Sequence, residues 1–235
     1  MKAVFIFGSK GTLGKEVVNI LSKSYYIIEV ERSLDNKLEY KYEKTKGIVK
    51  INLANIEHSK KFYKVFETLN KIQKFQSVDI VYLSAIYKGE NIEEIFNINC
   101  LSFYYIIKNY IQVFINISKG NIITIGSNLL KRVNMSSAAY ISSKSALVFM
   151  TKQFAYEYGK DGYRFNSISP GFFCSKMNDK TTTNKELNLF VKNTPLKRLG
   201  TAKDISQIIK ILLSEEAYWI TGENIVVDGG NSLGF

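Results

Sequence analysis

The stretch that decides the fold stands at the N-terminus and reads Lys2-Ala3-Val4-Phe5-Ile6-Phe7-Gly8-Ser9-Lys10-Gly11-Thr12-Leu13-Gly14-Lys15-Glu16-Val17-Val18-Asn19-Ile20-Leu21. It predicts an apolar strand, a glycine-rich turn and an amphipathic helix, in the order that a dinucleotide site requires. Glycines let the backbone approach a pyrophosphate, and the helix N-terminus offers free N–H groups and the positive end of the helix dipole. Without a ligand the same pattern is an ordinary turn, so its meaning depends on the rest of the chain.

Beyond this turn, strand-like and helix-like segments alternate along the whole sequence. The predicted strands cover about 2–7, 26–31, 47–51, 78–84, 119–126, 163–169 and 224–227, and the longest predicted helices cover about 91–116 and 138–160. Such alternation predicts an α/β, Rossmann-type, doubly wound parallel sheet of about seven strands, with helices on both faces and ligands at the carboxyl ends of the strands. No linker or repeat divides the chain, so we expect residues 1–235 to form a single domain.

A second pattern carries chemistry. Tyr140-Ile141-Ser142-Ser143-Lys144 places a tyrosine and a lysine one turn apart on one helix face, and Ser127 stands thirteen residues upstream. A free phenol titrates near pH 10, but a neighbouring ammonium favours the phenolate and lowers the pKa. With a serine hydroxyl to hold a substrate oxygen, this set could move one proton while another group moves a hydride. If the Tyr/Lys pair stood alone in the sequence, the alternative would be an exposed pair on a helix with no catalytic role.

Together these residues resemble the short-chain dehydrogenase/reductase family, and further motifs extend the resemblance over nearly the whole chain. The matching stretches are 96–102 with Asn99, 121–127 with Ser127, 164–171, 194–200, 220–222 and 227–230. The resemblance implies that Tyr140 exchanges a proton with the substrate oxygen while the nicotinamide exchanges a hydride with carbon. It also implies that Lys144 holds the ribose and lowers the pKa of Tyr140, that Ser127 stabilises the substrate oxygen, and that Asn99 orients a water. No metal is required.

The cofactor pattern departs from the family in three places. The turn is G-x-x-G-x-x-G, tighter than the usual G-x-x-x-G-x-G; Leu83-Ser84-Ala85-Ile86 replaces Asn-Asn-Ala-Gly; and Asn52 replaces the usual acidic residue, although its amide oxygen can still bind an adenine amino group. The residues predicted to contact the cofactor are Gly8, Ser9, Lys10, Gly11, Thr12, Leu13, Gly14, Glu31, Arg32, Asn52, Leu53, Ser84, Ala85, Tyr140, Lys144, Pro170, Gly171, Phe173 and Ser175.

The choice between NADP(H) and NAD(H) depends on three of these residues. A carboxylate at the end of the second strand, Glu31, would bind the ribose hydroxyls of NAD, whereas Arg32 or Lys10 would pair with the 2′-phosphate of NADP. Because two of these residues are cations and only one is an acid, we favour NADP(H), with NAD(H) as the alternative.

Composition limits the classes of function. The net charge of +11 fits attraction to anionic ligands or an ordinary solvated surface, and without a base-reading motif we expect no nucleic-acid partner. No apolar stretch approaches the roughly 20 residues that span a bilayer, so we expect no membrane contact. Two cysteines are too few for a disulfide framework and favour the cytoplasm.

Two features bear on substrate and assembly. The polar segment of about 175–195 is expected to be a substrate loop, with an ordinary surface loop as the alternative. The aromatic helices around Phe103 and Phe149 predict a homodimer, or a homotetramer.

Three functions remain open from the sequence. The first is NAD(P)(H)-dependent transfer of a hydride to a carbonyl or from a secondary alcohol of a small molecule, with a sugar or nucleotide-sugar favoured by analogy with the tight turn. The second is reduction of a 3-oxoacyl carrier. The third is a non-catalytic dinucleotide sensor or scaffold, against which the complete set of Ser127, Tyr140, Lys144 and Asn99 argues.

Overall fold

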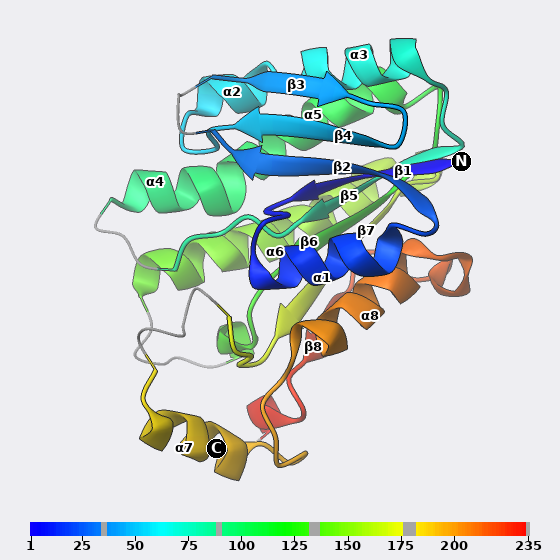
Figure 1. The fold of residues 1–235 in the computed structure, drawn as a ribbon. Coiled ribbons are helices and arrows are strands. Elements are labelled where there is room, and N and C mark those ends of the chain that lie inside the picture. Colours follow the sequence, from blue (N-terminus) through cyan, green and yellow to red (C-terminus); the bar gives the residue numbers. More distant parts are fainter. Residues whose placement is uncertain (34–36, 88–90, 132–136, 176–181, 234–235) are drawn as a thin grey trace.

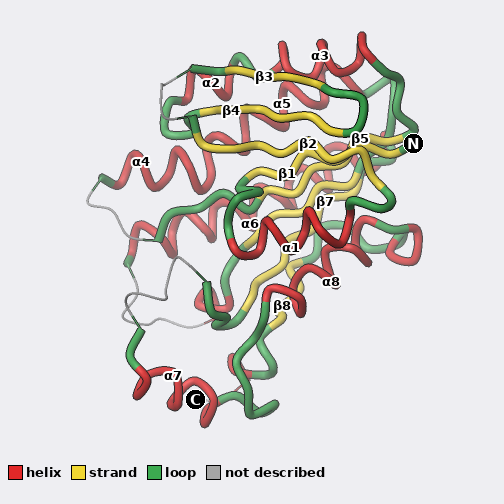
Figure 2. The backbone as a smooth tube through the Cα atoms, in the orientation of Figure 1, coloured by secondary structure: helices red, strands yellow, loops and turns green. Residues whose placement is uncertain are grey.

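A twisted sheet runs through the middle of the molecule, and helices cover both of its faces (Figures 1 and 2). The computed structural model describes residues 1–33, 37–87, 91–131, 137–175 and 182–233 of the chain. The strands are β1 (Lys2–Phe7), β2 (Tyr25–Arg32), β3 (Glu39–Tyr42), β4 (Lys46–Ile51), β5 (Ser77–Tyr82), β6 (Asn121–Ile125), β7 (Arg164–Pro170) and β8 (Asn224–Val227). Their order in the sheet is β3-β4-β2-β1-β5-β6-β7-β8.

All strand pairs are parallel except β3 with β4, which pair antiparallel at one edge. The helices are α1 (Thr12–Leu21), α2 (Ile56–Lys60), α3 (Tyr63–Ile72), α4 (Ile92–Phe96), α5 (Ser102–Phe114), α6 (Ala138–Tyr158), α7 (Asn184–Asn193) and α8 (Ala202–Leu213). The predicted doubly wound α/β fold is therefore confirmed.

Strand β1 shows how the sequence builds two cores. Side chains alternate across a strand, so Phe5 and Phe7 pack on one face of the sheet against α3, α5 and α6, while Val4 and Ile6 pack on the other against α1 and α8. All four of these side chains are fully buried. An uninterrupted apolar run is what a parallel strand with both faces covered requires.

The strand order reverses beside β1, which lies between β2 and β5. The connections that leave β1 and β5 therefore diverge, and they open a crevice at the carboxyl ends of these strands, where open α/β sheets bind ligands. The loops after the two strands meet there: a Cβ atom added to Gly8 would lie 3.2 Å from the backbone nitrogen of Ser84.

Three details differ from the sequence prediction. Strand β3 was not predicted, so the sheet contains eight strands rather than about seven. The helix predicted at about 91–116 is interrupted by a π-helical turn at Asn97–Leu101, between α4 and α5. The second half of the predicted substrate loop forms α7, which a capping box between Thr183 and Glu186 starts; residues 176–181 of that loop lie outside the described residues.

Candidate active site

Backbone hydrogen bonds fix the glycine turn between β1 and α1. The N–H of Gly8 donates to the Val30 carbonyl (3.1 Å), and the N–H of Gly11 donates to the Gly8 carbonyl (3.1 Å). Gly8 has a φ of +81°, which favours glycine. A Cβ atom on Gly14 would lie 2.2 Å from the Gly8 oxygen. Glycine is thus required at both ends of the turn.

The turn fits the pyrophosphate of a dinucleotide. Gly11 is the N-cap of α1 and supplies no side-chain cap, so this helix start lacks the side-chain acceptor that capped helices have. The Ser9 side chain is buried, and its hydroxyl has no hydrogen-bond partner among the described residues. A buried hydroxyl beside an uncapped helix N-terminus is a donor that a phosphate oxygen would satisfy.

Lys10, which the sequence analysis considered for the 2′-phosphate of NADP, forms ion pairs within the protein. Its ammonium lies 3.0 Å from a carboxylate oxygen of Glu31 and 3.3 Å from one of Glu29, and the Glu31 carboxylate is the main reason why the pKa of Lys10 is raised. Arg32, by contrast, is exposed at the end of β2. The sequence reasoning named Glu31 but missed Glu29, although both lie on one face of the strand two residues apart.

On the adenine side, the loop after β4 is fixed in place. The Asn52 amide oxygen accepts a hydrogen bond from the Ala54 N–H (3.0 Å), and the Ser102 hydroxyl donates to the Leu53 carbonyl (2.7 Å). Asn97 binds the Ala54 carbonyl as well (3.0 Å). The predicted adenine contact Asn52 therefore lies at the carboxyl end of β4, on a loop that the π-helical turn and α5 hold.

Ser84 and Ala85 follow β5, where the N–H of Leu83 donates to the Phe7 carbonyl at the end of β1 (3.0 Å). Both residues are half-buried. The chain passes the glycine turn here, so Ser84 and Ala85 lie beside the crevice at the carboxyl ends of β1 and β5.

Tyr140 lies in the first turn of α6. Ser137 caps this helix, and its hydroxyl accepts a hydrogen bond from the Tyr140 N–H (3.5 Å). The phenol of Tyr140 faces the side chain of Ser127, which follows β6 and lowers the pKa of the phenol. The structure thus brings together the two hydroxyls that the sequence separates by thirteen residues.

Lys144 lies one turn further along α6 and is 1% exposed. Its ammonium donates to the Ile125 carbonyl at the end of β6 (2.7 Å). Burial lowers the pKa of this ammonium to about 8. Lys144 therefore reaches the predicted rim of the sheet, held against the last residue of the strand that precedes Ser127.

The pKa of Tyr140 corrects one expectation from the sequence. We expected Lys144 to lower it, but burial raises the pKa of Tyr140 to about 12, against a smaller lowering by the Ser127 side chain. The physical reason is that removal of a phenolate from water disfavours the charged form, while the ammonium of Lys144 is bound to a backbone carbonyl. At neutral pH the phenol is protonated and available as an acid.

Asn99 is fully buried within the π-helical turn, and its side chain is completely engaged. Its amide oxygen accepts from the Ile86 N–H (2.8 Å), and its amide nitrogen donates to the Ile86 carbonyl (3.0 Å) and the Ser143 hydroxyl (3.0 Å). The Ser143 hydroxyl in turn donates to the Tyr140 carbonyl (2.8 Å). Both N–H groups of Asn99 are therefore used in joining the loop after β5 to α6, which leaves none for a water.

The predicted nicotinamide turn follows β7. The N–H of Gly171 donates to the Val227 carbonyl (2.9 Å), and a Cβ atom on Gly171 would lie 2.5 Å from that of Asp228. Phe173 pairs with Gly200 in an isolated bridge. Pro170 is the last residue of β7, and Gly171, Phe173 and Ser175 follow it beyond the carboxyl end of the strand. A hollow of about 230 Å³ opens beside Gly171.

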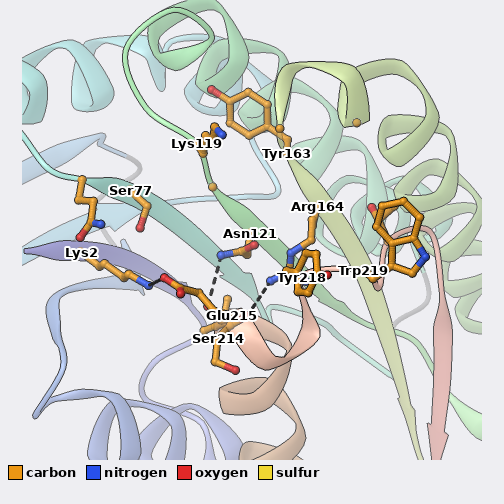
Figure 3. A pocket seen from close by; sticks show the side chains of 16 residues that line it. Lys2, Ser77, Lys119, Asn121, Tyr163, Arg164, Ser214, Glu215, Tyr218 and Trp219 are labelled. Carbon is orange, nitrogen blue, oxygen red and sulfur yellow. Dashed lines mark hydrogen bonds and ion pairs between the residues drawn. The ribbon is translucent and has the colours of Figure 1, made fainter.

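A larger hollow, of about 610 Å³, lies at the amino-terminal ends of the strands (Figure 3). Its lining includes the first residues of four strands, which are Lys2, Ser77, Asn121 and Arg164. The catalytic candidates lie at the other ends of the strands, so the size of this hollow does not identify the active site. The candidate active site is the crevice at the carboxyl ends of the strands.

Two classes of site are not found among the described residues. None of their helices is both long and apolar enough to cross a lipid bilayer. Within the same residues, histidine, cysteine, aspartate and glutamate side chains form no group of three that could hold a metal ion.

Comparison with known proteins agrees with this geometry. A family model described as enoyl-(acyl carrier protein) reductase matches residues 42–232. The chain is 32% identical to the 3-oxoacyl-[acyl-carrier-protein] reductase FabG of Buchnera aphidicola subsp. Schizaphis graminum, over 97% of this chain and 96% of that protein.

Two solved structures are similar over nearly their whole length. One is 4-hydroxyisoleucine dehydrogenase complexed with NADH (25% identity, TM-score 0.84, 99% of this chain and 100% of that one). The other is ElxO with NADP bound (23% identity, TM-score 0.82, 98% of each chain). With the ordered glycine turn, serine, tyrosine and lysine, these matches establish that the chain belongs to the short-chain dehydrogenase/reductase family of NAD(P)-dependent oxidoreductases.

Proposed function

We propose that the protein reduces a carbonyl group, with Tyr140 as the proton donor to the substrate oxygen. The observation that carries this proposal is the position of the Tyr140 phenol, which interacts with the Ser127 side chain and stands one helical turn from Lys144. Burial raises the pKa of this phenol, which is therefore protonated at neutral pH. When bound, the dinucleotide supplies the hydride. Ser127 holds the substrate oxygen next to the phenol, and Lys144 would hold the ribose of the dinucleotide and so position the nicotinamide. The buried Asn99 amide fixes the position of α6.

For the substrate, we propose a 3-oxoacyl thioester in preference to a sugar. The proposal is supported by the FabG relative, at 32% identity over 97% of the chain. The hollow beside Gly171 supports it as well, because Phe172, Phe173 and Phe190 line it, and the rings of Phe172 and Phe190 stack at 4.5 Å. An aromatic wall suits an acyl chain better than a polyhydroxylated ring.

Tyr140→Phe tests the role of the acid, because it keeps the ring and removes only the proton. With acetoacetyl-CoA and NADPH, we expect kcat/KM to fall about a hundred- to ten-thousand-fold, while NADPH binding stays within about threefold of the parent protein. Turnover within about threefold of the parent would remove Tyr140 from the mechanism. An aldose panel measured beside acetoacetyl-CoA decides between the two substrate classes, and activity on aldoses alone would reverse our choice.

For the cofactor, we propose a preference for NADP(H) over NAD(H) that depends on Arg32. Lys10 is shared between Glu29 and Glu31, whereas the guanidinium of Arg32 is exposed at the end of β2, where a 2′-phosphate would be recognised. Arginine can bind a phosphate through two parallel hydrogen bonds.

For assembly, we propose a homodimer that pairs through α5 and α6, or a homotetramer that adds a second interface. Most rings that prompted this expectation, such as Phe103 and Phe154, pack into the core. Phe149 and Tyr156 on α6 are nevertheless 70% and 87% exposed, and Leu101 and Tyr104 lie exposed around the start of α5. Multi-angle light scattering at low micromolar concentration tests the proposal, and a stable monomer would contradict it. Phe149→Asp should dissociate the dimer.

We also propose that residues 1–235 form one domain and that the protein works in the cytoplasm. One continuous sheet includes strands from the start of the chain to Val227, which supports the first statement. Both cysteines, the buried Cys100 and the exposed Cys174, are free thiols, which is compatible with a reducing compartment. Limited proteolysis that yields a stable fragment much shorter than the chain would contradict a single domain.

A further inference from the structure

Tyr87, which the sequence analysis did not single out, contacts the proposed proton donor directly. Its ring lies edge-on to the ring of Tyr140, with centroids 4.8 Å apart and planes inclined by 74°. Edge-to-face pairs at this separation are attractive, because the positive edge of one ring meets the negative face of the other. Both side chains are half-buried. Tyr87 follows Ala85-Ile86 and therefore lies just beyond the segment in which the family pattern is altered.

The two tyrosines are fixed to each other by their backbones as well as by their rings. Ile86, the residue before Tyr87, has its N–H and its carbonyl both bound by the Asn99 side chain (2.8 and 3.0 Å). The same amide binds Ser143 (3.0 Å), whose hydroxyl donates to the Tyr140 carbonyl (2.8 Å). One buried amide thus sets the distance between the two chain segments from which the rings extend.

The orientation of the Tyr140 ring decides whether its phenol can act as an acid. It lies in the first turn of α6, just after the N-cap Ser137, and the cap hydrogen bond to its N–H is long, at 3.5 Å. Its phenol must nevertheless point at Ser127, since a general acid works only within hydrogen-bond reach of the atom that receives the proton. A displacement of about 1 Å from the reactive geometry can cost on the order of a hundredfold in rate.

We propose that Tyr87 is a positioning residue that holds the Tyr140 ring in its reactive orientation. Its aromatic ring, rather than its hydroxyl, does this. This proposal rests on the proposed function, in which Tyr140 is the acid. The tests therefore distinguish a Tyr140 that is not the acid from a Tyr87 that does not position it.

The first test is kinetic, with acetoacetyl-CoA and NADPH as the probe. We expect Tyr87→Ala to lower kcat about tenfold and to increase the primary deuterium isotope effect with 4-deuterated NADPH, because the chemical step becomes slower. NADPH binding should stay within about twofold of the parent protein. Tyr87→Phe, which keeps the ring, should restore kcat to within about twofold. Tyr218→Ala, an exposed tyrosine near the amino-terminal ends of the strands, is the matched control and should leave kcat unchanged.

Three kinetic results would overturn the proposal. A Tyr87→Ala variant with the parent kcat and a raised KM for acetoacetyl-CoA would make Tyr87 a wall of the substrate pocket only. Equal losses in Tyr87→Phe and Tyr87→Ala would assign the effect to the hydroxyl. Full activity of Tyr140→Phe would instead remove the proposed acid, whatever Tyr87 does.

The second test does not need a substrate. In a crystal structure of Tyr87→Ala, we expect the Tyr140 ring to leave Ser127 or to occupy two rotamers, while Asn99 keeps its bonds to Ile86. A Tyr140 ring unchanged in position and order would refute the support role, even if Tyr140→Phe is inactive.

Discussion

Replacement of Gly14 by alanine should damage both the fold and the cofactor site, because the added methyl group has no space. Its carbon would lie 2.2 Å from the Gly8 oxygen and 2.7 Å from the Cα and carbonyl carbon of Ser9. These are backbone atoms, so the turn itself must move by about 1 Å to reach ordinary contact distances. Overpacking of this kind destabilises proteins by about 1–3 kcal/mol.

The same displacement separates the turn from the phosphates that it is expected to bind. A hydrogen bond to a charged group contributes about 1.5–3 kcal/mol, so the loss of one such bond weakens dinucleotide binding by roughly 10- to 150-fold. Fluorescence titration with NADPH and thermal unfolding measure the two effects independently.

Gly11→Ala is the matched control in the same turn. A Cβ atom there would meet only the Gly8 oxygen, at 3.3 Å, and the φ of Gly11 is −68°, which alanine adopts freely. We expect this variant to bind NADPH within about threefold of the parent protein, since alanine is only modestly worse than glycine at an N-cap. If Gly14→Ala matched Gly11→Ala in melting temperature and affinity, our account of the turn would be refuted.

Lys144→Met should weaken dinucleotide binding and slow turnover together, which titration and steady-state kinetics on one preparation would show; weaker binding with an unchanged kcat would reduce Lys144 to a cofactor clamp. Arg32→Glu should weaken NADPH binding by roughly 1.5–3 kcal/mol and spare NADH, and a loss confined to NADH would reverse our reading of β2. Burial raises the pKa of Asp79 to about 7, so the folded protein binds an extra proton between about pH 4 and 7 and its stability falls as pH rises through this window. Asp79→Asn should abolish that fall, as measured by urea unfolding at pH 5 and pH 8, and parallel losses in both proteins would show that other groups cause it.

Much of the fold was predictable because the parallel strands are buried on both faces. Runs such as Val4–Phe7 are apolar at every position, and a glycine turn marks the first of them. Strand β3 lacked this signal: Glu39, Tyr40 and Lys41 are exposed at the sheet edge, so no apolar run announces them. An edge strand of this kind is recognised by its pairing with β4, which the sequence of β3 alone does not show.

The site was predictable where function depends on residue type and spacing, as for Ser127, Tyr140 and Lys144. The site was not predictable where function depends on which polar side chains already have hydrogen-bond or ion-pair partners within the protein. Lys10 proved to be paired with two carboxylates, and both N–H groups of Asn99 are used within the protein. Such pairings join residues far apart in the sequence, so no local pattern records them.

The π-helical turn at Asn97–Leu101 makes this part of the chain sensitive to length rather than to composition. Two buried side chains, Ile95 and Phe103, are separated by eight residues, whereas two α-helical turns take about seven. A deletion of one residue between them would give a regular helix and rotate Asn99 by about 100° away from Ile86 and Ser143. Among natural variants of this chain, single-residue deletions in this segment should therefore be rare, even though the deleted form would be the better helix.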